Sequence, residues 1–187
     1  MHAMRGARFA VRAAQLVVAT ACGTTSGLPP ASFANAVDTL SLYALDGTPL
    51  SAPSGYNLAG NAVVRTDRAF RFDFAFNITP AGQAVLLPTG ALGMGRGSGI
   101  QVQTIPFDAV TIAPTTAYVD TMAVPLDSGT VAVLHSQPTT CVFGAVVFYY
   151  GKVEVLAIDT VARRLDLQVL VDQNCGYRGL EPGTPRQ

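Results

Sequence analysis

The chain is 187 residues long, and 49% of its residues are apolar while only 13% are charged. This apolar fraction is too high for an intrinsically disordered chain, and the length favours one globular domain. Twelve Lys and Arg residues balance twelve Asp and Glu residues, which argues against a nucleic-acid partner. No apolar run approaches the roughly 18 residues of a membrane span. Three cysteines are too few for a disulfide-dense miniprotein.

The N-terminus has the layout of a secretory signal peptide. Arg5, Arg8 and Arg12 form a basic patch, residues 13–21 carry no charge, and Cys22 follows. A basic segment, a short apolar stretch and small residues before a cleavage site are the three parts of such a signal. We therefore expect residues 1–21 to be a signal peptide and the mature protein to be exported.

Residues 16–22, LVVATAC, resemble the lipobox of bacterial lipoproteins. In that class the cysteine becomes the first mature residue and carries the lipid, so the resemblance implies lipidation at Cys22 and a membrane as partner. The two residues before the cysteine are small, as in the motif, whereas Ala19 stands where leucine is favoured. Gly23, in place of an aspartate, implies the outer membrane in a cell with two membranes. The same residues also form an ordinary Ala-x-Ala cleavage site, so the alternative is a soluble periplasmic or secreted protein.

Cysteine parity is consistent with this anchor. An odd cysteine in an exported protein needs an explanation, and a lipid on Cys22 leaves the pair Cys141 and Cys175. In an oxidising compartment we expect this pair to form a disulfide, which in the chain-entropy model stabilises the fold by about 3–4 kcal/mol. The alternative is two buried free thiols.

Most of the chain after a Gly-, Thr-, Ser- and Pro-rich tether at 22–34 consists of short β-rich segments separated by turns. No segment shows the 3.6-residue apolar stripe and the caps of a helix. Strands are expected at 37–45, 56–65, 69–78, 84–87, 100–107, 110–113, 118–126, 131–135, 142–150, 153–158 and 165–171. We therefore predict one all-β domain at 35–180, an antiparallel β-sandwich with a β-barrel as the alternative, and a flexible tail at 181–187.

The clearest alternation lies at 69–78, where phenylalanine occupies every second position from 70 to 76. These residues are Phe70, Phe72, Phe74 and Phe76. A strict period of two puts them on one face of a strand, and we expect Arg71 and Asp73 to face solvent on the other. The stripe has two interpretations: it fills the core between two sheets, or it lines a cavity that holds an apolar ligand.

No motif assigns a catalytic or metal-binding role. The glycine-rich stretch 93–99 lacks the lysine of a phosphate-binding loop and leads into a strand, so we expect a flexible loop. His135 is the one histidine after the signal peptide. A catalytic triad could combine it with a distant serine and Asp120 or Asp127, but no Gly-x-Ser-x-Gly motif is present. One histidine and two bridged cysteines cannot form a zinc set, and we expect no cofactor.

These observations lead to one main expectation and two alternatives. We expect a lipid-anchored β-sandwich of the cell envelope that acts as a binding or structural module and is not an enzyme. Its ligand or protein partner does not follow from the sequence. The first alternative is a carrier of a small apolar ligand, and the more remote one is a hydrolase that uses His135.

Overall fold

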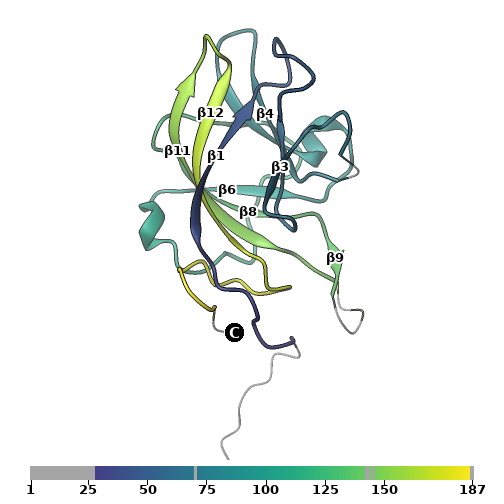
Figure 1. The fold of residues 1–187 in the computed structure, drawn as a ribbon, viewed down its shortest axis with the longest axis vertical. Helices are drawn as coiled ribbons and strands as arrows, with labels where there is room; N and C mark the ends of the chain where they lie inside the picture. Colours follow the sequence, from purple (N-terminus) through teal and green to yellow (C-terminus); the bar gives the residue numbers. More distant parts are fainter. Residues whose placement is uncertain (1–27, 70, 142–143, 145, 186–187) are drawn as a thin grey trace, which may run out of the picture.

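The computed structural model describes residues 28–69, 71–141, 144 and 146–185. This part of the chain forms two five-stranded antiparallel sheets and one two-stranded hairpin (Figure 1). Neither five-stranded sheet closes on itself. The predicted all-β sandwich is therefore confirmed for the described residues, and the barrel alternative is wrong. The proposed signal peptide and Cys22 lie outside the described residues.

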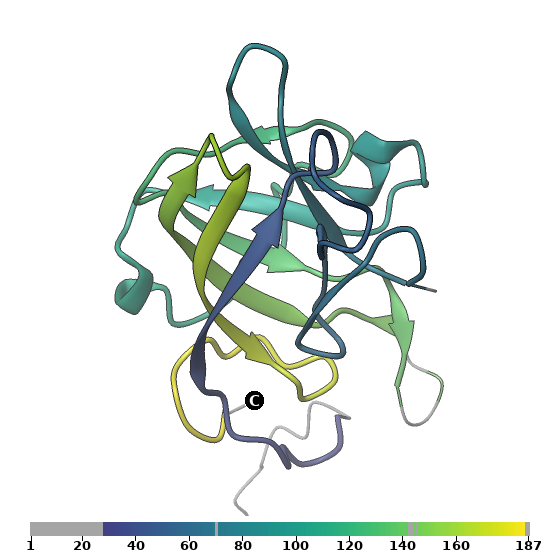
Figure 2. The same ribbon diagram turned by 45° about the horizontal axis from the view of Figure 1, so that its top comes forward.

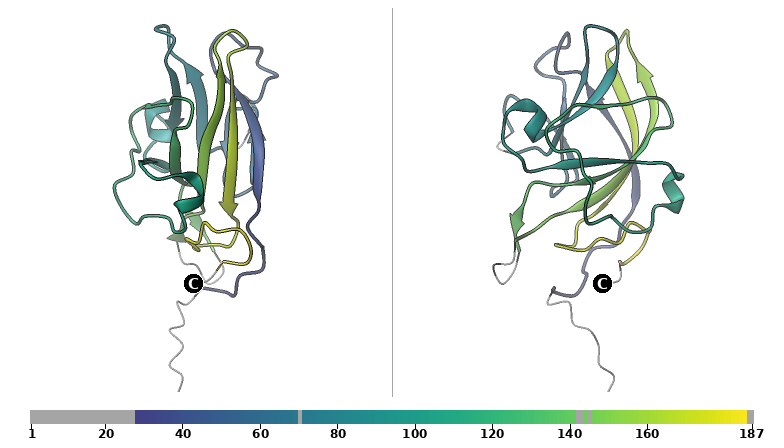
Figure 3. Two further views of the ribbon diagram at one scale, coloured as in Figure 1. Left: turned by 90° about the vertical axis from the view of Figure 1, so that its left-hand side faces the viewer. Right: turned by 180° about the vertical axis from the view of Figure 1, so that it is seen from behind.

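The first sheet has the strand order β1–β12–β11–β8–β6. Its strands are β1 (Val37–Tyr43), β12 (Arg164–Asp172), β11 (Tyr150–Asp159), β8 (Val131–His135) and β6 (Gly99–Gln103). The second sheet has the order β3–β2–β4–β5–β7. Its strands are β3 (Ala62–Val64), β2 (Gly55–Asn57), β4 (Phe74–Ile78), β5 (Ala84–Pro88) and β7 (Val124–Pro125). The left view of Figure 3 shows the strands edge-on as layers.

The shorter elements lie outside these two sheets. The hairpin pairs β9 (Thr139–Thr140) with β10 (Val146–Val147), and two short 3-10 helices, η1 (Thr89–Leu92) and η2 (Phe107–Ala109), lie in loops. Over the described residues, no helix is long and apolar enough to cross a membrane. The apolar run at 142–150, which we expected to be one strand, is instead divided between β10 and the start of β11. An apolar run by itself carries no signal for where its pairing partner changes.

The core fills the space between the two sheets. Alternate residues of β12 point into it, and Leu165 and Leu167 are buried while Asp166 between them is not. Phe74 and Phe76 of β4 face them from the second sheet, and both are completely buried in the same cluster. Period-two patterning on both layers thus produces one shared apolar interior.

The phenylalanine stripe follows the prediction only in part. Phe72, Phe74 and Phe76 are buried, and Phe70 lies outside the described residues. Asp73 is also completely buried, so its predicted exposure is wrong. The reason is that β4 begins at Phe74, so the strict alternation of a strand does not apply to the residues before it. Arg71 is half-buried, and its Nη2 donates to the Gln137 carbonyl oxygen at 2.7 Å.

Part of the outer face of the first sheet carries a second apolar cluster. Loop residues Phe107, Val110 and Leu180 cover Val133 and Leu170 there. Because of this cover, the residues near the end of β12 are buried on both faces of the sheet. The sandwich therefore has a third, partial layer made of loops (Figure 3).

Lys152 of β11 lies under this loop layer with 1% of its surface exposed. Its Nζ donates to the carbonyl oxygens of Phe107 and Val110 at 2.8 and 2.9 Å, and it lies 4.3 Å from the centre of the Phe107 ring. Burial lowers the pKa of the Lys152 ammonium, and the negative charges of Asp108 and Glu181 partly offset this decrease. The lysine thus joins the η2 loop to the sheet.

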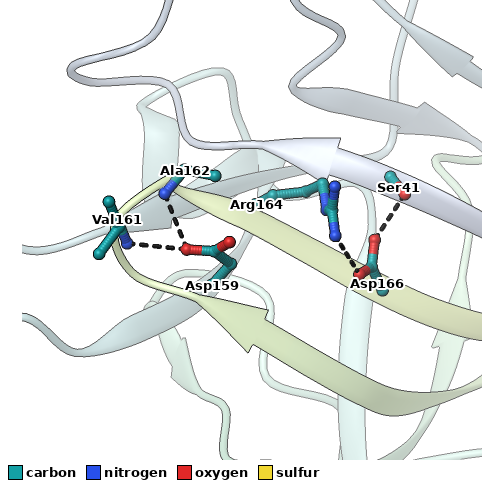
Figure 4. A network of polar contacts seen from close by, with 6 residues as sticks. All are labelled: Ser41, Asp159, Val161, Ala162, Arg164 and Asp166. Carbon is teal, nitrogen blue, oxygen red and sulfur yellow. Dashed lines mark hydrogen bonds and ion pairs between the residues drawn. The ribbon is translucent and has the colours of Figure 1, made fainter.

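At the other end of β11 and β12, the turn between them and the neighbouring part of β1 carry a network of polar contacts (Figure 4). In the turn between β11 and β12, the Asp159 carboxylate accepts hydrogen bonds from the backbone N–H groups of residues 161 and 162 at 2.9 and 2.8 Å. Asp166 accepts from Ser41 of β1 and from Arg164 at 2.6 and 3.1 Å. These local bonds fix the turn and join β1 to β12.

The chain entering β1 is bonded to the loops that follow β12. We call residues 29–35 the N-terminal strap. The backbone N–H groups of Ser32 and Phe33 both donate to Asn174 Oδ1, at 2.7 and 3.0 Å, and Asn174 Nδ2 donates to the Phe33 carbonyl oxygen at 2.8 Å. Asn35 and Gly183 exchange two backbone hydrogen bonds of 2.8 and 2.9 Å. The strap therefore runs along one end of the sandwich, beside the C-terminal segment (Figure 2).

Candidate functional site

His135 lies at the end of β8, between Gly99 of β6 and Tyr150 of β11. Its imidazole packs edge-to-face against Tyr118 and Phe148, with ring centres 4.5 and 4.7 Å away. A Cβ at position 99 would overlap the imidazole, so glycine is needed there for the ring to lie across the neighbouring strand. The result is a half-buried aromatic cluster on the outer face of the first sheet.

The hydrogen bond of His135 determines its tautomer. Nδ1 lies 2.9 Å from the Ser136 carbonyl oxygen, which can only accept, so Nδ1 carries the proton and donates. Burial lowers the pKa of His135, against a smaller opposing effect of this bond and of Asp73 and Asp120. The imidazole is therefore neutral at pH 7, with its lone pair on Nε2.

The groups that would complete a catalytic triad make other interactions. Ser136 Oγ donates to the Gln137 carbonyl oxygen at 2.6 Å and accepts from the Tyr149 N–H at 3.0 Å. Asp120 lies 3.6 Å from Arg96 in a surface ion pair. Among the described residues, no serine or threonine hydroxyl is hydrogen-bonded to His135, although Asp120 is near enough to affect its pKa.

Asp127 lies far from His135. It occupies the turn before β8, and its backbone N–H is held by Thr130 Oγ1 at 2.9 Å. His135 ends the same strand, so the length of β8 separates the two residues.

A buried polar network lies between the aromatic cluster and the second sheet. The two carboxylate oxygens of Asp73 accept from the backbone N–H groups of Leu58 and Gln137, each at 2.8 Å. Burial raises the pKa of Asp73, and these two hydrogen bonds partly offset the increase. Gln137 Nε2 also donates to the Phe72 carbonyl oxygen at 2.7 Å. Since both of these partners of the Asp73 carboxylate are backbone N–H groups, the network joins loops of the two sheets.

The glycine-rich loop is fixed at its base. Thr89, which precedes the loop, and Ser98, near its end, are both buried, and the Thr89 N–H donates to Ser98 Oγ at 3.0 Å. Ser98 Oγ in turn donates to the Asp73 carbonyl oxygen at 2.5 Å. The base of the loop is thus held by the same polar network, and β6 begins at Gly99, so the loop leads into a strand as the sequence predicted.

The predicted cysteine pair is brought together. Cys141 and Cys175 form a disulfide with a Cα–Cα distance of 6.1 Å, within the normal range for such bonds. The bridge links the β9–β10 hairpin to the residue that follows Asn174, the strap-binding asparagine. One covalent bond and the Asn174 side chain therefore connect hairpin, C-terminal loop and strap.

A groove lies at the same end. It has a volume of about 810 Å³ and is lined by Ile112, Tyr177, Arg178 and Glu181 among others. Leu28 and Pro185, the first and last described residues, also border it. Within the described ranges, no three His, Cys, Asp or Glu side chains gather as a metal site would require.

Sequence reasoning missed several of these residues. Asn174, Lys152 and Asp73 all bond to backbone groups that are distant in the sequence. The one available signal was the charge of Lys152 inside an otherwise apolar stretch, because a charge there must find buried partners. No protein-family model matches this chain, and a search of curated proteins found no match either.

Proposed function

We propose that this protein is an exported, lipid-anchored β-sandwich of the cell envelope that acts as a binding or structural module. The observation that carries the proposal is the disulfide between Cys141 and Cys175. Structural disulfides persist in oxidising compartments outside the cytosol. The bridge uses two of the three cysteines and leaves Cys22, which stands at the end of a signal-like segment, as the odd one.

The packing of the core supports a module rather than a carrier of an apolar ligand. Phe74, Phe76 and Leu134 are 0–1% exposed and belong to one cluster built from both sheets. A carrier needs an internal space bounded by such side chains. Here the rings of the stripe are in contact with the opposite layer instead.

The bonding of His135 supports a module rather than a hydrolase. A general base must lie within hydrogen-bond reach of its nucleophile. Nδ1 of His135 is bonded to a carbonyl oxygen, and the neighbouring Ser136 hydroxyl donates its proton to another carbonyl oxygen. Neither group is arranged for proton transfer between them.

The anchor is tested on the protein expressed in a bacterium with two membranes. Mass spectrometry of the membrane fraction should find a mature chain that begins at Cys22 and carries acyl mass. The matched control is Cys22→Ser, which removes the acylated thiol and leaves the other two cysteines paired. An unmodified N-terminus in the soluble fraction of the parent protein would refute the anchor and leave simple secretion.

The membrane is tested separately by density fractionation. The resemblance to lipoproteins implies the outer membrane for a chain with Gly23, and inner-membrane retention when aspartate follows the cysteine. Gly23→Asp should therefore move the protein from outer- to inner-membrane fractions. Co-fractionation of the parent with the inner membrane would contradict the assignment.

A further inference from the structure

Two acceptor oxygens are buried where the N-terminal strap meets the end of β12. Asn35, the last residue of the strap, is 4% exposed, and Asp172, the last residue of β12, is completely buried. Among the described residues, neither Asn35 Oδ1 nor Asp172 Oδ2 has a hydrogen-bond partner. Buried polar atoms in folded proteins are nearly always paired, so two unpaired acceptors at one junction need an explanation.

The register of the first sheet puts these two side chains opposite each other. Val37 of β1 lies opposite Leu170 of β12. The same register, continued by two residues, places Asn35 opposite Asp172. Asn35 exchanges its backbone hydrogen bonds with Gly183 on its other side, so its pairing with Asp172 is of the kind without hydrogen bonds. In such antiparallel pairs the opposed side chains lie on one face and come closest together.

The amide hydrogens near this junction are already used. Asn35 Nδ2 donates to two carbonyl oxygens of the C-terminal segment, at 2.9 and 3.1 Å. Exchanging the oxygen and nitrogen of this amide would turn Oδ1 toward those carbonyl oxygens, which can only accept. Asn174 Nδ2 donates to Asp172 Oδ1 and to the Phe33 carbonyl oxygen, each at 2.8 Å. Neither amide therefore has a hydrogen left for Asp172 Oδ2.

One proton on Asp172 provides both oxygens with a partner. A protonated carboxyl group is a donor as well as an acceptor. An Oδ2–H group can donate to Asn35 Oδ1 while Asp172 Oδ1 still accepts from Asn174. Burial raises the pKa of Asp172, and the amides of Asn174 and Asn35 partly offset this increase. Burial thus favours the same protonated form that the hydrogen bonds require.

No counter-ion compensates the carboxyl group at this junction. The ionisable side chains of the elements around it are Tyr150 and Lys152 of β11, His135 of β8, and Tyr177, Arg178 and Glu181 of the C-terminal segment. Residues 29–35 of the strap add none. Among the described residues no ion pair includes Asp172, and its pKa responds to burial and to the two amides. The charge of an ionised Asp172 would therefore stay unpaired.

We propose that Asp172 carries a proton on Oδ2 and donates it in a hydrogen bond to Asn35 Oδ1, and that this proton holds the strap against the end of β12. Loss of the proton leaves a carboxylate facing an amide oxygen with no donor between them, and the strap is released. Residues 29–35, which span at most about 25 Å when extended, then no longer lie along the C-terminal segment. This device depends neither on the lipid anchor nor on export.

The direction of the pH dependence follows from the two states of the carboxyl group. With the strap released, Asp172 is exposed to water and its pKa returns to about 3.9, whereas docking of the strap raises it. Docking is therefore strongest below the ordinary pKa and weakens as pH rises toward the raised value. Since one proton is coupled to docking, the docking equilibrium falls by at most about tenfold per pH unit in this range.

Hydrogen exchange of the Phe33 amide measures docking of the strap, because this N–H donates to Asn174 Oδ1. The full chain is measured from about pH 4 to about pH 8, and each rate is divided by the intrinsic rate at that pH. The Ala44 amide, which donates to a carbonyl oxygen beyond the other end of β1 at 2.9 Å, reports general unfolding in the same sample. In the parent protein we expect protection of Phe33 to fall relative to Ala44 as pH rises.

Asp172→Asn tests the proton directly. The amide that replaces the carboxyl group keeps a donor toward Asn35 Oδ1 at every pH, so protection of Phe33 relative to Ala44 should no longer depend on pH. Asp166→Asn is the matched control, because Asp166 lies on the same face of β12 but is half-buried and bonded to Ser41. Its pH dependence should equal that of the parent.

A titration of the parent protein tests the proposal even if Asp172→Asn does not fold. The NMR resonance of the Asp172 carboxyl carbon should titrate with a midpoint above about 3.9, and a midpoint at or below this value overturns the proton. Constant protection of Phe33 in the parent, or equal pH dependence in the parent and Asp172→Asn, overturns the release. Lower protection in Asp172→Asn at every pH means that an ionised carboxylate, for example one bridged by a water, holds the strap, and this also overturns the proposal.

Discussion

Replacement of Phe74 by alanine measures how tightly the two sheets pack. Phe74 is 0% exposed, and β4 pairs on both sides, with Tyr56 opposite it in β2 and Pro88 opposite it in β5. Because strands bonded on both sides cannot move inward to fill the space of the lost ring, we expect a loss in the usual range for buried Phe→Ala, about 3–5 kcal/mol. In a domain of this size the melting temperature falls by about 2–4 °C for each kcal/mol of lost stability. We therefore expect the melting temperature of Phe74→Ala to be lower by about 6–20 °C.

The assay is urea and thermal unfolding of the parent, Phe74→Ala and the control Phe33→Ala. Phe33 is 56% exposed, so its truncation should change the free energy of unfolding by no more than about 0.5 kcal/mol. Binding of an apolar dye is measured on the same three proteins. A large loss for Phe74→Ala, with no dye bound by the parent, agrees with a packed core. A small loss, with dye binding by the parent that weakens in Phe74→Ala, would refute the packing argument and support the carrier.

Three further outcomes are expected. Reduction of the Cys141–Cys175 bridge, which closes a loop with a sequence separation of 34, should cost about 3–4 kcal/mol and lower the melting temperature without changing the far-ultraviolet circular dichroism; an unchanged melting temperature would contradict this. Asn174→Ala removes the acceptor of the Phe33 N–H, so that amide should lose its protection from hydrogen exchange, whereas continued protection would show that the strap is held by other contacts. Burial lowers the pKa of His135 below its ordinary value of 6.5, so the unfolded state binds the proton more readily and stability should fall as pH drops below about 6.5. His135→Gln should lose less stability than the parent protein between pH 7.5 and 5.5. Equal losses in the two proteins would show that protonation of His135 is not the cause.

The sequence by itself determined the elements that depend on local pattern. Leu165 and Leu167 point inward because a strand turns successive side chains to opposite faces, a rule that needs only neighbouring residues. The same rule indicated the burial of Phe74 and Phe76. Cysteine parity, with the expectation that the protein is exported, was sufficient to predict the pairing of Cys141 with Cys175, because only one pairing remained once Cys22 was set aside.

The tertiary structure alone decided where the polar groups lie. Asp73 is buried because its carboxylate accepts from a backbone N–H 64 residues away, at Gln137. Asn174 is bonded to Ser32, 142 residues away, and Lys152 to a carbonyl oxygen 45 residues away. A buried polar group is stable only when it finds a partner, and backbone partners have the same chemistry at nearly every position. Their identity therefore follows from how the sheets and loops are stacked in space, which no local pattern of residues records.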